Sequence, residues 1–352
     1  HRLVGWISVA RDPGRELTQQ LAVVCRRLGD RLGRRLWDAA THGPFIQSDD
    51  PVRYPPVGRV LAASTPRDLL RVWVAGLSAE DSLAAAKAAV HAAPARVAGE
   101  TALTASVDVA ELAHRFSAEQ PDVLVIAGGY DNPRPGIDRP VVRLVRSMTE
   151  LLRRLPPGER PLVLYAGDHW TAPYAVDLLR SVSDSLTVEA VDNVRPAPDR
   201  VQTALLAARL TDEQWALAQR MPGFIRLARW VDEPARIVSL EANFTQAVRA
   251  WLEVEDLPYL HGLYYASAWR LHVLAEAGQP YVRLRYVENP ALDPELPDWP
   301  PVALMCGQPP GGAPAPAPRW HDRSGMLPVV AAIGQIAPAA MLHAMRSDLL
   351  AE

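Results

Sequence analysis

The segment PDVLVIAGGYDNP at residues 121–133 decides the fold class of this chain. It joins a run of aliphatic residues to a turn rich in Gly, Asp and Asn. Two segments of the same design follow, RPLVLYAGDHW at 160–170 and LTVEAVDNVRP at 186–196, and helical patterns separate them. Parallel α/β sheets present such turns at their carboxyl edge, where they bind ligands. The series therefore predicts a parallel sheet with its ligand-facing loops along one edge.

The alternation of strand and helix patterns extends outward from this series. Strands are expected at 71–75, 96–101, 122–127, 162–166 and 187–191, and helices at 80–93, 109–119, 139–155, 172–182 and 199–220. Before them come a strand at 3–10, a helix at 16–36 and a Pro- and Asp-rich loop at 42–56. Alternating βα units predict a parallel sheet that is covered by helices on both faces.

The pattern changes beyond residue 222. A helix is expected at 243–254, followed by strands at 259–266, 270–276 and 281–287 with short connections. Short connections between successive strands predict an antiparallel meander. The low-complexity segment GQPPGGAPAPAP at 307–318 has the composition of an extended linker, which cannot pack a core.

Composition excludes several classes of function. The 352 residues are 49% apolar and 22% charged, with a formal net charge of -3. This charge gives no electrostatic reason to expect binding to nucleic acid or to an anionic membrane. The two cysteines, Cys25 and Cys306, cannot build a disulfide framework, and no Cys or His cluster has zinc-ligand spacing. We therefore expect a cytoplasmic protein without a metal site.

One segment has the length of a membrane span. Residues 326–345 carry no formal charge, and about 20 apolar residues suffice to cross a bilayer. The segment is rich in Ala, however, and it contains Pro328 and Pro338. We expect a buried or docking helix broken at Pro338, and no membrane span.

Five stretches, taken in order, resemble one known family. They are LRVWVAGLSAEDSLAAAKAAVHAAPARVAGETAL at 70–103, PDVLVIAGGYDNP, LVLYAGDHW, VDNVRP and MPGFIRLARW at 221–230. The series is similar to the MutL-type family associated with adenosylcobalamin-dependent glutamate mutase, which shares only a name with the mismatch-repair protein. The resemblance covers about half of the chain. It implies the actin-like fold of the sugar-kinase superfamily and an ATP-dependent chaperone or reactivating role for the mutase.

The resemblance also implies a set of nucleotide- or ligand-facing residues. The family's Gly-Gly-Thr-Asp-Gly-Gly loop is kept here in part, since Tyr130 replaces the Thr and Asn132-Pro133 replaces the second Gly pair. The matching positions in this loop and in the two that follow are Gly128, Gly129, Asp131, Gly167, Asp168, Asp192 and Asn193. Turn formation explains these residue types equally well, because Gly supplies positive φ and Asp or Asn caps helices.

Other chemistry in these loops has an equally ordinary alternative. Asp168, His169 and Asp192 could meet at the sheet edge as an acid/base or metal group. Arg195 could contact an anion. Asx turns and exposed loop positions account for the same residues.

The phosphate-binding hairpins of the superfamily are poorly matched. Each half opens with Asp-x-Gly-(Ser/Gly)-x-x-Thr, and the first hairpin would lie upstream of Leu3. The second falls on LHGLYYASAWR at 260–270, where His261 and Leu263 replace the Asp and a Gly. A missing carboxylate removes a metal ligand, and bulky side chains fill the space for a phosphate. We therefore assign no catalytic residue and expect no cofactor; ATP and Mg²⁺ would bind only if the upstream hairpin exists.

The region after residue 250 is unusually aromatic. Half of such a meander should face a helix as core, and the remainder could form an interface, since Tyr and Trp are enriched there. The candidate interface residues are Tyr264, Tyr265 and Trp269.

The sequence therefore predicts an α/β protein with actin-like (ribonuclease H-like) halves. The expected divisions are a parallel-rich first half at 1–230, the start of a second half at 231–306, the linker at 307–318 and a helical segment at 319–352. The first functional hypothesis is a divergent MutL-like protein, with reduced or absent ATPase activity, that binds a protein partner as chaperone, assembly factor or structural subunit. The alternatives are an active ATP-dependent reactivating factor and a small-molecule enzyme that uses the sheet-edge loops.

Overall fold

The computed structural model describes most of the chain between residues 16 and 307. The described residues are 16–57, 63–64, 69–103, 108–131, 140–221, 224–231, 237–254, 256–265, 269–279, 282–288 and 302–307. The strand expected at 3–10, the apolar segment at 326–345, the C-terminal segment at 319–352 and all but the first residue of the linker lie outside them. No helix within the described ranges is long and apolar enough to cross a membrane.

Contacts divide the chain into two compact units. The first contains residues 68–214 and 283–288, and the second contains the remaining described residues. The domain boundaries expected at residues 230, 306 and 318 stay predictions.

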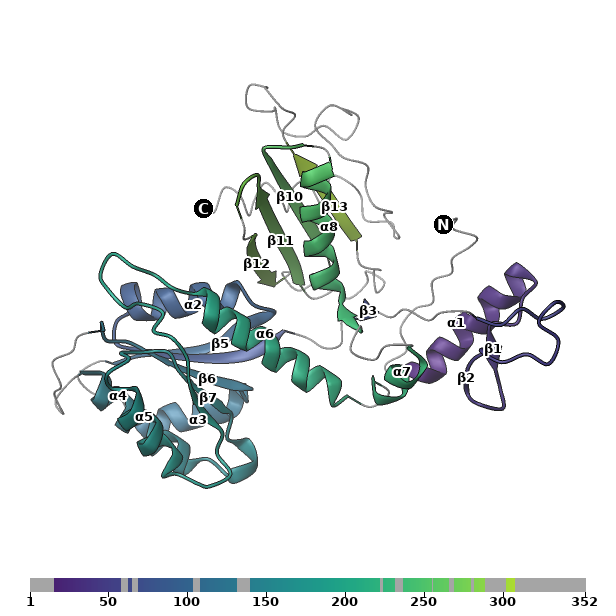
Figure 1. The fold of residues 1–352 in the computed structure, drawn as a ribbon. Coiled ribbons are helices and arrows are strands. Elements are labelled where there is room, and N and C mark those ends of the chain that lie inside the picture. The colour runs from purple at the N-terminus through teal and green to yellow at the C-terminus, as the bar shows by residue number, and fades with distance from the viewer. Residues whose placement is uncertain are drawn as a thin grey trace, which may run out of the picture. The chain divides into compact units, whose positions relative to one another are not determined.

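The first unit is built on a five-stranded parallel sheet (Figure 1). Its strands are β4 (Leu70–Gly76), β5 (Ala95–Ala102), β6 (Val123–Ala127), β7 (Leu162–Tyr165) and β8 (Val188–Ala190). The strand order is β5-β4-β6-β7-β8, and every neighbouring pair is parallel. Numbered along the chain this is the 2-1-3-4-5 order, in which the winding reverses between β4 and β6. The predicted parallel sheet is confirmed.

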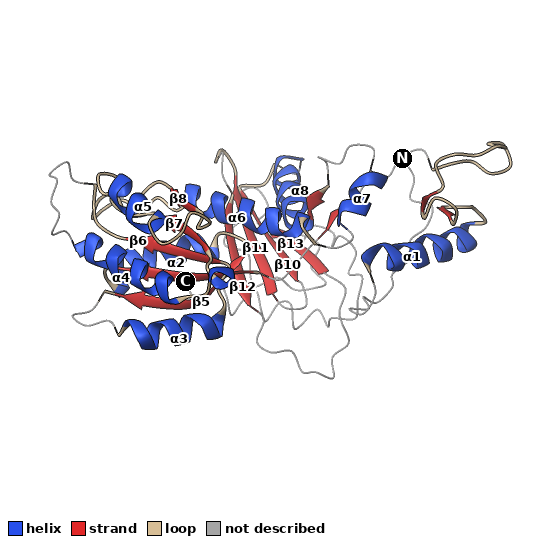
Figure 2. Ribbon diagram, turned by 90° about the horizontal axis from the view of Figure 1, so that it is seen from below, coloured by secondary structure: helices blue, strands red, loops and turns tan. Residues whose placement is uncertain are grey.

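Helices cover both faces of this sheet. They are α2 (Ala84–His91), α3 (Val109–Glu119), α4 (Pro140–Arg154), α5 (Ala172–Arg180) and α6 (Ala204–Gln219), with a short 3-10 turn η2 (Pro157–Glu159). α3, α4 and α5 lie side by side on one face, and α2 and the start of α6 lie on the other (Figures 1 and 2). α3 begins where the sequence predicts, because the Asp108 carboxylate accepts hydrogen bonds from the backbone N–H groups of Ala110 and Glu111.

The core of the first unit follows from strand and helix periodicity. All five residues of β6 are buried, as a central parallel strand requires. The inner face of α4 contributes Leu144, Val145 and Met148, which are fully buried against the sheet. Gly99 lies on β5 where any side chain would collide with the ring of Trp73. This packing fixes the sheet and thus the positions of the loops at its edge.

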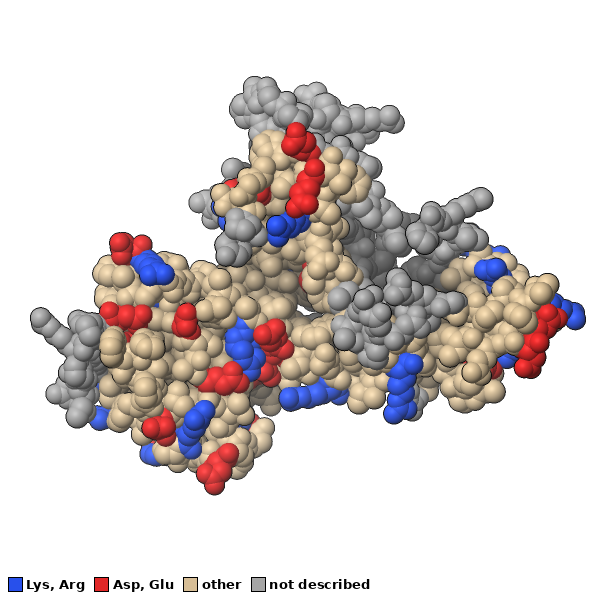
Figure 3. All heavy atoms as spheres, viewed as in Figure 1, with Lys and Arg blue, Asp and Glu red and all other residues tan. Residues whose placement is uncertain are grey.

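Two predicted helices differ from those observed. The helix expected at 80–93 begins as a π-helix, η1 (Ala79–Leu83), before it continues as α2. The helix expected at 16–36 is α1 (Leu17–Leu32), which ends because Gly33 adopts a left-handed conformation with φ 62°. On the surface of the first unit, acidic and basic side chains are interspersed over the face that Figure 3 shows.

The second unit contains the first two of the three predicted antiparallel strands. α8 (Leu240–Val254) is followed by β10 (Tyr259–Tyr265) and β11 (Trp269–Glu276), which pair antiparallel with His261 opposite Leu274. β13 (Val302–Gly307) pairs antiparallel with the other edge of β10. β12 (Arg283–Glu288) groups by its contacts with the first unit. The α/β class, with parallel strands followed by antiparallel ones, is therefore confirmed; the actin-type identity of the halves stays a prediction.

The remaining elements of the second unit are short. They are β1 (Trp37–Asp38), β2 (Gly43–Pro44), β3 (Ala63–Ser64), α7 (Phe224–Trp230) and β9 (Val238–Ser239). β1 and β2 form an antiparallel pair inside the region expected to be a loop, and β3 pairs in parallel with β9.

Candidate functional site

The carboxyl edge of the parallel sheet gathers the loops that the sequence singles out. Residues 77–78 and η1 follow β4, residues 128–131 follow β6, residues 166–171 follow β7, and residues 191–203 follow β8. The strand order places the first two of these loops at the switch point, where doubly wound sheets bind ligands.

The two glycines after β6 are required by the path of the chain. Gly128 has φ 144° and Gly129 has φ 82°, a region that favours glycine. A Cβ on Gly128 would lie 2.6 Å from Leu77 Cγ, and one on Gly129 would lie 3.0 Å from Asp168 Cβ. The loop can therefore pass between its neighbours only without side chains.

Asp131 and Asn193 join three of the loops. The Oδ1 atom of Asp131 accepts hydrogen bonds from the backbone N–H of His169 at 2.8 Å and from Asn193 Nδ2 at 3.0 Å. The same Nδ2 donates to the carbonyl of Gly129 at 2.9 Å. Asn193 Oδ1 in turn accepts from the backbone N–H of Arg195 at 3.0 Å. The buried amide of Asn193 is thus the link between the loops after β6 and β8.

Asp168 is held at the start of α5. Its side chain is fully buried; Oδ2 accepts from Thr171 Oγ1 at 2.6 Å and Oδ1 from the backbone N–H of Trp170 at 3.1 Å. The preceding Gly167 packs so closely that a Cβ would lie 2.6 Å from the carbonyl oxygen of Gly128. This carboxylate stabilises a local turn, which was the alternative to a ligand-binding role that the sequence left open.

Six of the seven predicted loop residues come together, and the seventh does not join them. Gly128, Gly129, Asp131, Gly167, Asp168 and Asn193 contact one another through the bonds and packing above. Asp192 lies in the same edge, but its side chain is exposed. His169 is exposed as well, and only its backbone N–H takes part in the Asp131 contact.

A second polar cluster lies at the switch point, and its centre was not predicted. Tyr130 donates its phenol O–H to Asp81 Oδ2 at 2.8 Å. Arg195 donates from Nε to the other carboxylate oxygen of Asp81 and from Nη2 to the carbonyl of Pro198. The hydrogen bond to Asp81 raises the pKa of Tyr130 above its ordinary value, with desolvation as the next cause. Arg195 and Tyr130 were noted from the sequence, but Asp81, which lies 114 positions before Arg195, was not. The one signal available was a carboxylate in the first turn after β4, at the reversal of strand order.

Apolar side chains are exposed along the same edge. Tyr130, Trp170 and Tyr174 are 42%, 57% and 44% exposed. Val201 and Leu205, in the loop after β8 and the first turn of α6, are similarly exposed. These five, which we call the edge patch, include every large hydrophobic residue found exposed in the described part of the first unit.

In the second unit, the residues at the positions of the superfamily's phosphate-binding hairpin are buried. His261 is buried, and its ring stacks on His272 with Nε2 3.0 Å from Nδ1. Gly262 faces α8, where a Cβ would collide with Val248 and lie 2.9 Å from Phe244 Cζ. The turn at 266–268 is outside the described residues.

The predicted aromatic interface of the second unit is mostly core. Tyr264 and Trp269 are 6% and 3% exposed, and the Tyr264 ring lies 5.7 Å from both Trp269 and Phe244. We therefore place these two residues in the core between the sheet and α8. The side chain of Tyr265 lies outside the described residues.

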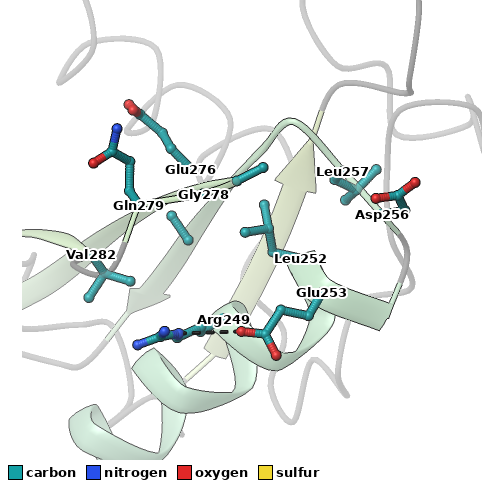
Figure 4. A pocket seen from close by; sticks show the side chains of 11 residues that line it. Arg249, Leu252, Glu253, Asp256, Leu257, Glu276, Gly278, Gln279 and Val282 are labelled. Carbon is teal, nitrogen blue, oxygen red and sulfur yellow. Dashed lines mark hydrogen bonds and ion pairs between the residues drawn. The ribbon is translucent and has the colours of Figure 1, made fainter.

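A pocket of about 720 Å³ opens beside the end of α8 (Figure 4). Its apolar wall includes Leu252 and Leu257, and Arg249 pairs with Glu253 at 3.4 Å within it. None of the predicted site residues lines it. Within the described ranges, no three His, Cys, Asp or Glu side chains are grouped as metal ligands.

Comparison with known proteins gives one match. The model of the family described as MutL protein matches residues 18–237, which is more than half of the chain. No curated protein matches the chain, and no solved structure does. The matched region contains β4 to β8 and every loop of the carboxyl edge, so the resemblance seen in the sequence is confirmed. The chain belongs to the MutL protein family.

Proposed function

We propose that this MutL-family protein acts by binding a protein partner, as a chaperone, assembly factor or structural subunit, with little or no ATPase activity of its own. The observation that carries the proposal is the edge patch. Its exposed Tyr and Trp side chains surround loops whose polar groups are largely bonded to one another.

The hydrogen bonds of the sheet edge favour a partner that contacts the exposed aromatic side chains over a ligand that contacts the polar loop residues. Asp131 and Asn193 already bond to neighbouring loops, and Asp168 bonds within its own turn. A ligand that used these atoms would have to break those bonds. Breaking a buried hydrogen bond costs about 1–3 kcal/mol per group left unsatisfied. A partner that packs on the aromatic rings leaves the hydrogen bonds of the Tyr130 and Tyr174 hydroxyl groups in place. Tyr and Trp are enriched at the centres of protein interfaces, and exposed apolar patches mark such sites.

The second unit supports reduced ATPase chemistry. Actin-like ATPases use a carboxylate and small residues in the turn between the first two strands of a half. Here His261 lies in the core and Gly262 packs against α8, so neither is free to approach a phosphate. We expect no tightly held cofactor in the purified protein.

The family resemblance names the first partner to test, an adenosylcobalamin-dependent mutase from the same organism. Binding of the purified mutase to the full chain should weaken at least tenfold when Trp170→Ala and Tyr174→Ala are combined. The matched control is Tyr54→Ala, which removes a 45% exposed tyrosine from the second unit. Unchanged affinity in the double variant would contradict the proposed surface.

Addition of MgATP to the purified full chain tests the alternative that the protein is an active ATPase. A bound nucleotide at 100 times its dissociation constant stabilises a protein by about 2.7 kcal/mol. We expect no such stabilisation and no phosphate release. Saturable stabilisation by MgATP together with hydrolysis would favour an active reactivating factor.

A further inference from the structure

The cluster of Asp81, Tyr130 and Arg195 has the geometry of an occupied anion site. Two donors from different loops, a phenol O–H and a guanidinium N–H, meet the two oxygens of one carboxylate. Charge-assisted contacts of this kind are how proteins recognise carboxylates and phosphates. The carboxylate here is supplied by the protein itself.

The position of the cluster is the one at which this class of sheet takes ligands. Asp81 follows β4 and Tyr130 follows β6, the two strands between which the winding reverses. Arg195 reaches them from the loop after β8. The cluster is also open to solvent, since the side chains of Arg195 and Asp81 are 21% and 31% exposed.

The carboxylate of Asp81 belongs to a π-helical turn. Asp81 is the middle residue of η1, a five-residue π-helix that leads into α2. π-Helical turns are rare and often occur at functional sites. The start of η1 is anchored by Ser82, whose Oγ accepts from the backbone N–H groups of Leu77 and Ser78.

We propose that the switch point binds a small anion, a carboxylate or a phosphate, between Arg195 and Tyr130, and that Asp81 fills this position in the free protein. The inference does not depend on the proposed protein partner, because the partner test substitutes Trp170 and Tyr174, which take no part in the anion cluster; Tyr130 belongs to both the cluster and the edge patch. An external anion must compete with a carboxylate that is tethered nearby, so binding to the unmodified protein is weak.

The test removes the competing charge without removing the side chain. Asp81→Asn should bind inorganic phosphate or succinate at least about tenfold more tightly than the unmodified chain, since charged acceptors make the stronger bonds to guanidinium. Calorimetric titration of the full chain at constant ionic strength, with sodium chloride replaced by the probe, measures this. The matched control is Glu80→Gln, which makes the same charge change on the neighbouring exposed residue of η1 and should bind as the unmodified chain does.

A second substitution tests the donor. Adding Arg195→Gln to Asp81→Asn should abolish binding, whereas adding Arg200→Gln, an exposed arginine of the same loop, should not. Equal affinity of Asp81→Asn and Glu80→Gln overturns the proposal, as does binding that survives the loss of Arg195. If far-UV circular dichroism shows that Asp81→Asn does not fold, Asp81→Ser makes the same comparison.

Discussion

The carboxyl edge of the parallel sheet and the β10–β11 pair use similar residues for different purposes. At the edge, Gly128 and Gly129 have positive φ and let one loop pass between two others. On β10, Gly262 lies in a strand and makes room for the side chains of α8. Gly128 and Gly129 are thus required by a turn of the chain, whereas Gly262 is required by the packing of a strand against a helix.

The two regions also differ in where their aromatic residues lie. Tyr130 and Trp170 project into solvent from loops, whereas Tyr264 and Trp269 are buried between a sheet and a helix. Loops have no partner layer to cover them, while each face of a sheet is covered by whatever helix packs on it. Exposed aromatic side chains therefore lie beside the loops for which the sequence predicts a ligand.

The largest effect is expected at Gly262. Gly262→Val should lower the free energy of unfolding by about 3 kcal/mol, because overpacking a closed contact forces the surrounding side chains to move. Gly278→Ala is the control; its Cβ meets nothing within 4 Å but its φ is 74°, and it should cost only about 1 kcal/mol of backbone strain. Urea unfolding measures both. A loss of stability at Gly262 no larger than that at Gly278 would contradict the close packing of Gly262 against α8.

The next effect is expected at Asn193, the link between the edge loops. Asn193→Ala should destabilise the first unit by about 2 kcal/mol, because it removes the hydrogen bonds that the buried amide makes to Gly129, Asp131 and Arg195. Asp192→Ala, one position earlier and exposed, should change stability by less than about 0.5 kcal/mol. Equal effects of the two substitutions, measured by urea unfolding, would mean that the edge loops are not held by Asn193.

A smaller effect is expected at the ion pair between β8 and α6. Arg209 donates to both oxygens of Glu189 at 2.7 and 2.8 Å. Because the Glu189 side chain is 38% exposed, Arg209→Gln should cost only about 1 kcal/mol at neutral pH.

The same pair has a defined pH dependence. The hydrogen bond from Arg209 holds the pKa of Glu189 below its ordinary value. The stabilisation is therefore present above the pKa of the unfolded chain and is lost as the pH falls through the folded pKa. The stability difference between the unmodified chain and Arg209→Gln should shrink below about pH 4. A difference that stays constant into acid would rule out this pairing.

The smallest effect is expected at Tyr130. Its hydrogen bond to Asp81 raises its pKa, so the contribution to stability is complete below the unfolded pKa and is lost as the pH rises through the folded one. Tyr130→Phe should therefore lose a small stabilisation at neutral pH that the unmodified chain also loses above about pH 10. Spectrophotometric titration should show one late-ionising phenol fewer in the variant. An unchanged titration would show that Tyr130 and Asp81 are not bonded in solution.

Local patterns predicted the elements well where one cause dominates. α3 matches its predicted range because a single Asp cap fixes its start, and β6 is predicted to within one residue because its apolar run is bounded by turn residues. α6 begins five residues later than expected, at Ala204. The loop after β8 turns back first, with a bridge between Ala197 and Arg200. The π-helical start of α2 had no sequence signal, since its geometry is associated with the packing of Ser82 and Leu83 on Gly76.

Sequence patterns alone were enough to predict the alternation of strands and helices, the parallel sheet, the loops along its carboxyl edge and the family. These follow from periodicity and turn residues, which act over a few positions of the chain. The three-dimensional fold was needed to show that Asp81 contacts Tyr130 and Arg195, that Asn193 joins the loops, and that Tyr264 and Trp269 are core residues. These outcomes depend on strand order and on which layer covers each face, and they join residues that are as much as 114 positions apart.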